Sequence, residues 1–150
     1  MIIHAYNEDP TEALKDYSKL CFMETDTAIN HTNKVAAGGV VLYTIDNILS
    51  KNFQLVYSAN LDICEASAFL YGISYALDQR IEYLNCDTDS EGLYNAFTPT
   101  GKEDKTLMEV LKSIKRIAKF FKVLNLELSS RYLVNEAHKQ ANIGLENALR

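Results

Sequence analysis

Three acidic residues stand where strands are expected to end or a helix to begin. Asp26 lies near the end of the first long strand, Glu65 at the start of the first long helix, and Asp89 just after a later strand. Carboxylates that converge are suited to Mg²⁺, which prefers carboxylate oxygens and retained waters. Two such ions can activate a water and neutralise the leaving oxygen of a phosphodiester. Whether the three acids meet depends on the elements that carry them.

Those elements follow from the hydrophobic periodicity of the chain. The order is three strands, a helix, a strand, two helices, a strand and a last helix, which predicts an α/β fold. Its five-stranded mixed sheet begins with three antiparallel strands, continues parallel, and has helices on both faces. Strands are expected over residues 19–29, 37–45, 53–59, 81–86 and 123–129, and helices over 62–79, 91–97, 107–122 and 135–150.

Length and composition indicate one globular domain. The 150 residues are 47% hydrophobic and 23% charged, and no Gly-, Pro- or Ser-rich linker divides them. Residues 1–18 are expected to form a polar extension, with one short helix from Pro10, and residues 19–150 to form the domain. The apolar runs are too short to span a bilayer, so we expect a cytoplasmic protein without a membrane partner. Three widely spaced cysteines, in apolar stretches, are expected to be reduced core thiols: Cys21, Cys64 and Cys86.

The order of elements and the acidic segments resemble the type I ribonuclease H family. Residues 22–28 (Phe-Met-Glu-Thr-Asp-Thr-Ala) are similar to the family's first-strand motif, in which Asp is followed by Gly-Ser. Glu65-Ala66 falls at the start of the first long helix, and Thr88-Asp89-Ser90 follows the fourth strand, as in the family. The resemblance implies a ribonuclease H-like fold with Asp26, Glu65 and Asp89 as catalytic ligands of two Mg²⁺ or Mn²⁺ ions. It also implies cleavage of the RNA strand of RNA–DNA hybrids.

The family's fourth acidic position falls on a histidine in this chain. Residues 137–141 read Ala-His-Lys-Gln-Ala, where the family usually has Ala-Asp followed two residues later by Leu-Ala. The resemblance therefore makes His138 a candidate fourth metal ligand and catalytic residue, and imidazole in that place favours a softer metal such as Mn²⁺. The alternative is a solvated side chain on an amphipathic helix. Thr27-Ala28 likewise departs from the family's Gly-Ser.

Four lysines of the long helix expected over residues 107–122 have the same spacing as its buried apolar residues, and each stands one position after one of them. The net charge of −5 argues against a protein that coats nucleic acid non-specifically. A local basic face remains open, because this segment holds a single acid, Glu109. The family's separate basic insertion is absent, and these lysines are either its substitute, binding nucleic acid, or a solvated face: Lys112, Lys115, Lys119 and Lys122.

Each of the three acids also has an interpretation without chemistry. Glu65 completes a capping box with Asp62 and can bond back to the start of its own helix. Asp89 can be the N-cap of the following short helix. Asp26 can be a turn residue before the loop 30–34. Against these interpretations stands the expected meeting of all three acids at one edge of the sheet.

Two other functions compete with hybrid cleavage. The order Glu24-Thr25-Asp26 echoes in reverse the paired acids of proofreading exonucleases, but that family has an Asp five residues after its late His. Ile143 stands there in this chain. The second alternative is a non-catalytic ribonuclease H-like module that binds nucleic acid or protein. The expected partner is an RNA–DNA hybrid, and a monomer is favoured.

Overall fold

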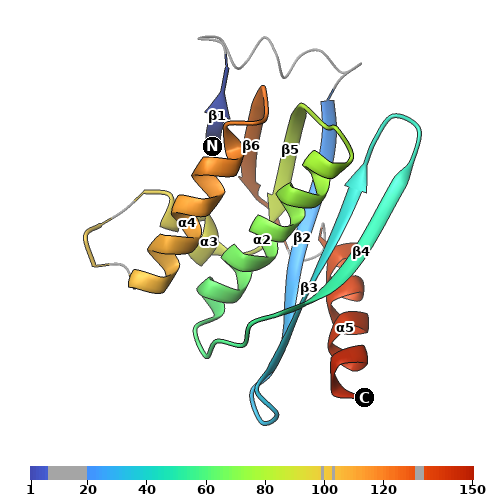
Figure 1. The fold of residues 1–150 in the computed structure, drawn as a ribbon, viewed down its shortest axis with the longest axis vertical. Coiled ribbons are helices and arrows are strands. Elements are labelled where there is room, and N and C mark those ends of the chain that lie inside the picture. The colour runs from blue at the N-terminus through green and yellow to red at the C-terminus, as the bar shows by residue number, and fades with distance from the viewer. Residues whose placement is uncertain (7–19, 99, 103, 131–133) are drawn as a thin grey trace.

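A single mixed sheet with helices on both faces organises the chain (Figure 1). The computed structural model describes residues 1–6, 20–98, 100–102, 104–130 and 134–150. The helix expected from Pro10 lies outside the described residues. The strands are β1 (Ile2–Ala5), β2 (Leu20–Asn30), β3 (Val35–Tyr43), β4 (Ile48–Leu55), β5 (Tyr83–Thr88) and β6 (Val123–Leu128). The helices are α2 (Leu61–Asp78), α3 (Glu91–Ala96), α4 (Lys105–Ala118) and α5 (Asn135–Leu149).

The strands lie in the order β1-β6-β5-β2-β3-β4. β2, β3 and β4 form an antiparallel meander, whereas β5 pairs parallel to β2 and β6 pairs parallel to β5. This confirms the predicted α/β class with an antiparallel start and a parallel continuation. The helices α2 and α4 lie side by side over one face, and α5 packs on β2, β3 and β4.

The sheet has six strands rather than the five expected. The additional strand, β1, pairs antiparallel with β6 at the edge of the sheet, within the segment 1–18 that we expected to be an extension. β4 begins and ends several residues before the expected 53–59. Its central residues Ser50 and Lys51 are exposed and polar because β4 is the opposite edge strand, so they resembled a turn in the sequence.

Alternation along β2 divides its side chains between two helical layers. Thr25 and Thr27 point towards α2: a Cβ at Gly72 of α2 would meet Thr25, and the hydroxyl of Thr27 reaches Glu65. Glu24 and Asp26 point the other way and contact the first turn of α5. One strand thus presents hydroxyl groups to one helix and carboxylates to another.

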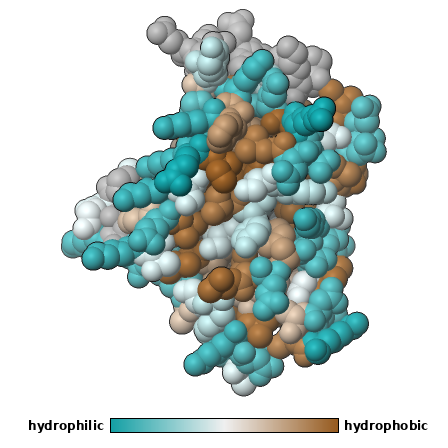
Figure 2. Space-filling view, in the orientation of Figure 1, coloured by the Kyte–Doolittle hydropathy of each residue, from teal (hydrophilic) through white to brown (hydrophobic). Residues whose placement is uncertain are grey.

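The main core fills the space between the sheet and the helices α2 and α4. Its buried stripe on α4 is the predicted one, with Leu107, Leu111 and Ile114 inside. Figure 2 shows the opposite pattern outside, where hydrophilic residues gather along the outer side of α4. The three cysteines are buried free thiols, as predicted. Within the described residues, every helix is too short or too polar to cross a bilayer.

The helix α5 packs unusually close to β3. A Cβ at Gly39 of β3 would overlap the backbone of Ala137 and Ala141, and a Cβ at Gly144 of α5 would press on Ala37. The residues of α5 that face the sheet are accordingly small. Close contact of two backbones fixes the distance between α5 and the sheet.

Candidate metal centre

Three carboxylates from three elements meet at one edge of the sheet. Asp26 comes from β2, Glu65 from the first turns of α2, and Asp89 from the residue after β5. One oxygen of each lies within 4.8 Å of the others. Asp26 and Glu65 are only 2% and 4% exposed, and Asp89 is half-buried. The structure thus brings together the three acids that the sequence singled out.

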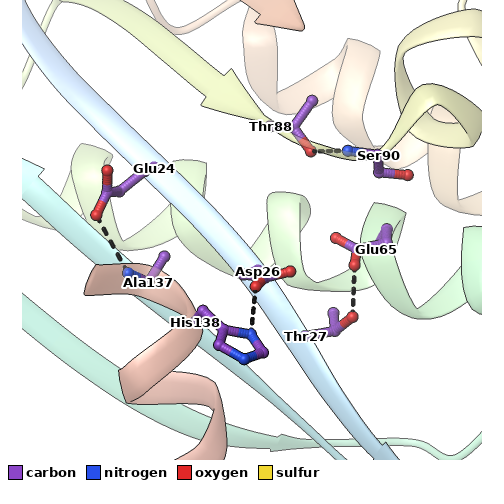
Figure 3. Close-up of polar contacts among 8 residues, drawn as sticks. All are labelled: Glu24, Asp26, Thr27, Glu65, Thr88, Ser90, Ala137 and His138. Carbon is purple, nitrogen blue, oxygen red and sulfur yellow. Dashed lines mark hydrogen bonds and ion pairs between the residues drawn. The ribbon is translucent and has the colours of Figure 1, made fainter. Parts of the chain in front are cut away.

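Strand register explains why Asp26 and Asp89 can meet. The parallel pairing of β2 with β5 ends at Glu24 and Asp87, so Asp26 and Asp89 both lie just past the last paired residues. The chain after β5 is held by Ser129, whose N–H donates to the carbonyl of Thr88, and by the Thr88 hydroxyl, which accepts from the N–H of Ser90 (Figure 3). Asp89 is therefore fixed on both sides.

The interpretations of these acids as caps and turns are wrong. The N-cap of α2 is Asn60, whose side chain accepts from the N–H of Asp62, and Glu65 does not bond back to its helix start. Ser90, rather than Asp89, caps α3. Asp26 lies inside β2 and pairs with Gly39, so it is not a turn residue. Within the described residues, the helix caps and the turn therefore belong to residues other than these three acids.

Glu65 is hydrogen-bonded by Thr27, a residue noted in the sequence only because it differs from the family's motif. The Thr27 hydroxyl donates to Glu65 Oε1 at 2.6 Å (Figure 3). Glu65 Oε2 is buried and, within the described part of the chain, faces no hydrogen-bond donor. The period of two along β2 predicts that Thr27 and Asp26 point to opposite faces of the sheet, but not that α2 is the helix that Thr27 meets.

His138 contacts the carboxylate cluster through Asp26. Its Nδ1 lies 2.8 Å from Asp26 Oδ2, and about one-third of its side chain is exposed (Figure 3). This position on α5 agrees with the resemblance, which placed the fourth site residue there. The ring nitrogen of His138 that faces the carboxylate cluster is therefore Nδ1, the one that contacts Asp26.

Burial and mutual repulsion make the carboxylates costly to ionise together. Burial, followed by repulsion from Asp26 and Asp89, raises the pKa of Glu65 to about 8, although the Thr27 hydrogen bond opposes this. Burial also raises the pKa of Asp26, and Asp89 adds to it, while Thr27 and His138 lower it. A group of this kind takes up either a proton or a cation.

The donor set therefore fits a hard divalent metal ion. Three carboxylates offer the oxygen ligands that Mg²⁺ and Mn²⁺ prefer. The buried Oε2 of Glu65, which faces no donor, is satisfied when a cation binds in the cluster. Of the four predicted metal-site residues, the structure groups Asp26, Glu65 and Asp89 as candidate ligands and places His138 against one of them.

The four lysines do not form a single set. Lys112, Lys115 and Lys119 are exposed on α4 or at its C-cap. Lys122 lies beyond the end of α4, which is shorter than expected. Its ammonium forms an ion pair with Glu82 at 3.1 Å and lies over the ring of Tyr83.

Comparisons with known structures agree with this fold. The structure of ribonuclease H1 from Halobacterium salinarum NRC-1 superposes with a TM-score of 0.76 at 17% identity, covering 85% of this chain and 98% of that one. The N-terminal RNase H domain of a Mycobacterium tuberculosis protein superposes with a TM-score of 0.72 at 18% identity, covering 88% of this chain and 97% of that one. LC11-RNase H1 from compost, in complex with an RNA/DNA hybrid, superposes with a TM-score of 0.75 at 18% identity, covering 87% of this chain and 99% of that one. No curated protein matched by sequence.

The fold is therefore ribonuclease H-like, as the sequence predicted. The family profile described as reverse transcriptase-like matches residues 24–144, a span that begins two residues before Asp26 and includes Glu65, Asp89 and His138. The chain belongs to this family.

The raised pKa of Glu65 predicts how stability changes with pH. Because the folded state holds a proton on Glu65 more tightly than the unfolded state, whose value is near 4.5, the metal-free protein loses stability between about pH 4.5 and 8. Glu65→Gln removes this loss. The measurement is urea unfolding in EDTA at pH 5 and pH 8. From pH 5 to pH 8, the free energy of unfolding of Glu65→Gln should rise relative to that of wild type by at least about 1.4 kcal/mol, which corresponds to one pKa unit.

A control is Glu109→Gln on the exposed side of α4, which should follow wild type at both pH values. Parallel curves for Glu65→Gln and wild type would contradict the raised pKa.

Proposed function

We propose that this protein is a metal-dependent endoribonuclease that hydrolyses the RNA strand of RNA–DNA hybrids. The observation that carries the proposal is the meeting of Asp26, Glu65 and Asp89 within 4.8 Å on a ribonuclease H-like fold. Support comes from LC11-RNase H1, which shares the fold and was solved with an RNA/DNA hybrid.

In this proposal Asp26, Glu65 and Asp89 hold two Mg²⁺ or Mn²⁺ ions. When bound, the ions supply activation of water and neutralisation of the leaving oxygen. Thr27 fixes the Glu65 carboxylate by its hydrogen bond, so that Oε2 stays turned to the cluster. Burial of Asp26 and Glu65 keeps bulk water from competing at their oxygens.

His138 is the proposed fourth member of the site. Its Nδ1 is the ring nitrogen that faces the cluster, 2.8 Å from Asp26 Oδ2, and is therefore the atom that would ligate an ion there. The lysines Lys112, Lys115 and Lys119 are proposed to contact phosphates of the hybrid. Lys122 is left out of this set because its ammonium forms an ion pair with Glu82.

The contact between His138 and Asp26 also favours an alternative in which His138 is not a metal ligand. If His138 holds Asp26 without ligating a metal, the domain has three acids at most. In that case it works with three or is a non-catalytic module that binds nucleic acid or protein. Cleavage assays with hybrid, double-stranded RNA and single-stranded RNA, each with Mg²⁺ and Mn²⁺, separate these functions.

Neutralising one carboxylate of the site should abolish cleavage. Asp26→Asn or Asp89→Asn removes a charged ligand and weakens the whole cluster, while relieving repulsion between acids. We expect metal-dependent hybrid cleavage to fall by at least about 100-fold, with an unchanged circular dichroism spectrum.

The matched control is Asp87→Asn, two residues before Asp89, where the carboxylate accepts from the Ser129 hydroxyl outside the cluster. This variant should cleave at close to the wild-type rate. Wild-type rates in Asp26→Asn and Asp89→Asn would refute the assigned site.

The lysines of α4 should set the salt dependence of binding. Each phosphate contact contributes about 0.9 to the slope of log affinity against log salt. Replacing Lys115 and Lys119 together by Ala should flatten that slope by roughly two units, measured with a labelled hybrid in EDTA. Lys122→Ala is the control and should leave it unchanged. Equal slopes for all three proteins would make these lysines a solvated face.

The identity of residue 138 should set metal preference. His138→Asp restores a hard anionic ligand, so Mg²⁺-supported cleavage should rise relative to Mn²⁺-supported cleavage. His138→Ala should shift the ratio the other way. The measurement is hybrid cleavage by the three proteins in each metal. The same ratio in all three would place His138 outside the metal site.

A further inference from the structure

Glu24 is a buried carboxylate outside the cluster that the proposed site does not use. It is 5% exposed and lies two residues before Asp26, on the same face of β2. A buried carboxylate is costly unless hydrogen bonds compensate for its lost hydration. Its partners therefore indicate what it stabilises.

Both hydrogen bonds to Glu24 come from elements packed against β2, and both end on Oε1. The backbone N–H of Ala137 in α5 donates to it at 3.1 Å (Figure 3). The hydroxyl of Tyr43 in β3 also donates to it at 3.1 Å. Burial between these elements raises the pKa of Glu24, while the two hydrogen bonds lower it. Burial, followed by the charge of Glu24 and the hydrogen bond to it, raises the pKa of Tyr43 to about 12.

The helix α5 begins without a cap from its own N-cap residue. Val134 occupies the N-cap and has no side-chain oxygen to accept a first-turn N–H. Serine, threonine, aspartate or asparagine usually fills this role, and a negative charge is favourable at this end of a helix. Glu24 takes that role from a distant strand by accepting the N–H of Ala137.

The capped residue is adjacent in sequence to the site residue. Ala137 bonds to Glu24, and His138, the next residue, contacts Asp26 at 2.8 Å. Two alternate residues of β2 therefore hold two successive residues of α5. Gly39 sets how closely α5 approaches the sheet, but a close backbone contact by itself leaves the helix able to slide or turn.

We propose that Glu24 is a positioning residue: by capping α5 from within β2, its carboxylate fixes the first turn of α5 and holds His138 against Asp26. The effect on cleavage rests on the proposed function, whereas the effect on the helix does not. Among the described residues, Glu24 is hydrogen-bonded to Ala137 of α5 and to Tyr43 of β3, and to none of the three carboxylates of the cluster.

The test compares Glu24→Ala, Glu24→Gln and Asn52→Ala. The glutamine keeps an amide oxygen to accept from Ala137, so it should restore what alanine removes. Asn52→Ala removes the hydrogen bond from Asn52 of β4 to Gln140 of the same helix, and so weakens α5 docking away from its first turn. The measurements are amide hydrogen exchange at Ala137 and His138, and kcat and KM for hybrid cleavage.

We expect Glu24→Ala to accelerate exchange at Ala137 and His138 and to lower kcat by about 10–100-fold with little change in KM, because displaced catalytic groups lose transition-state stabilisation. Glu24→Gln should bring both readouts back towards wild type. Asn52→Ala should leave the exchange of these two amides and kcat near wild type.

Unchanged exchange in Glu24→Ala would overturn the proposal. So would wild-type kcat, or a loss of kcat that Asn52→Ala reproduces. If wild type itself cleaves no substrate, the proposed function fails, and the exchange data alone decide whether Glu24 fixes the first turn of α5: faster exchange supports the proposal and unchanged exchange refutes it.

Discussion

The central constraint on this molecule is that three carboxylates are held together and that two of them, Asp26 and Glu65, are buried. Asp26, Glu65 and Asp89 repel one another when ionised, and burial of the first two removes the hydration that would offset the repulsion. Hydrophobic packing of the sheet against α2 must supply the free energy that keeps them close. The arrangement is relieved by protons or by cations, so the site couples the fold to whichever of these is bound.

The strand β2 connects this constraint to the rest of the fold. Because its side chains alternate, Thr27 stabilises Glu65 on the side of α2, while Glu24 and Asp26 hold the first turn of α5 on the other side. The parallel partner β5 brings Asp89 to the same edge. The site therefore depends on the register of β2 against both neighbours, and a slip of one residue would exchange the two faces.

The sequence predicted the fold class and the meeting of the three acids because both follow from strong local signals: the switch from period two to helical period, and acids placed at element ends. Exposed edge strands were less predictable, since a four-residue β1 and the polar β4 look like loops until their partners are known. The roles of Thr27 and Glu24 could not be read from local sequence, because each depends on which helix packs on which face of β2. Similarly, nothing local indicates that Lys122 pairs with Glu82.

The proposed function depends on the three carboxylates forming a metal centre, and direct observation of a bound paramagnetic ion tests this without any assay of cleavage. Titrating the protein with substoichiometric Mn²⁺ and recording amide NMR spectra should broaden signals selectively around Asp26, Glu65, Asp89 and His138, and excess Mg²⁺ should restore them. Broadening centred away from these four residues, or an absence of broadening anywhere, would contradict the assignment of the metal centre.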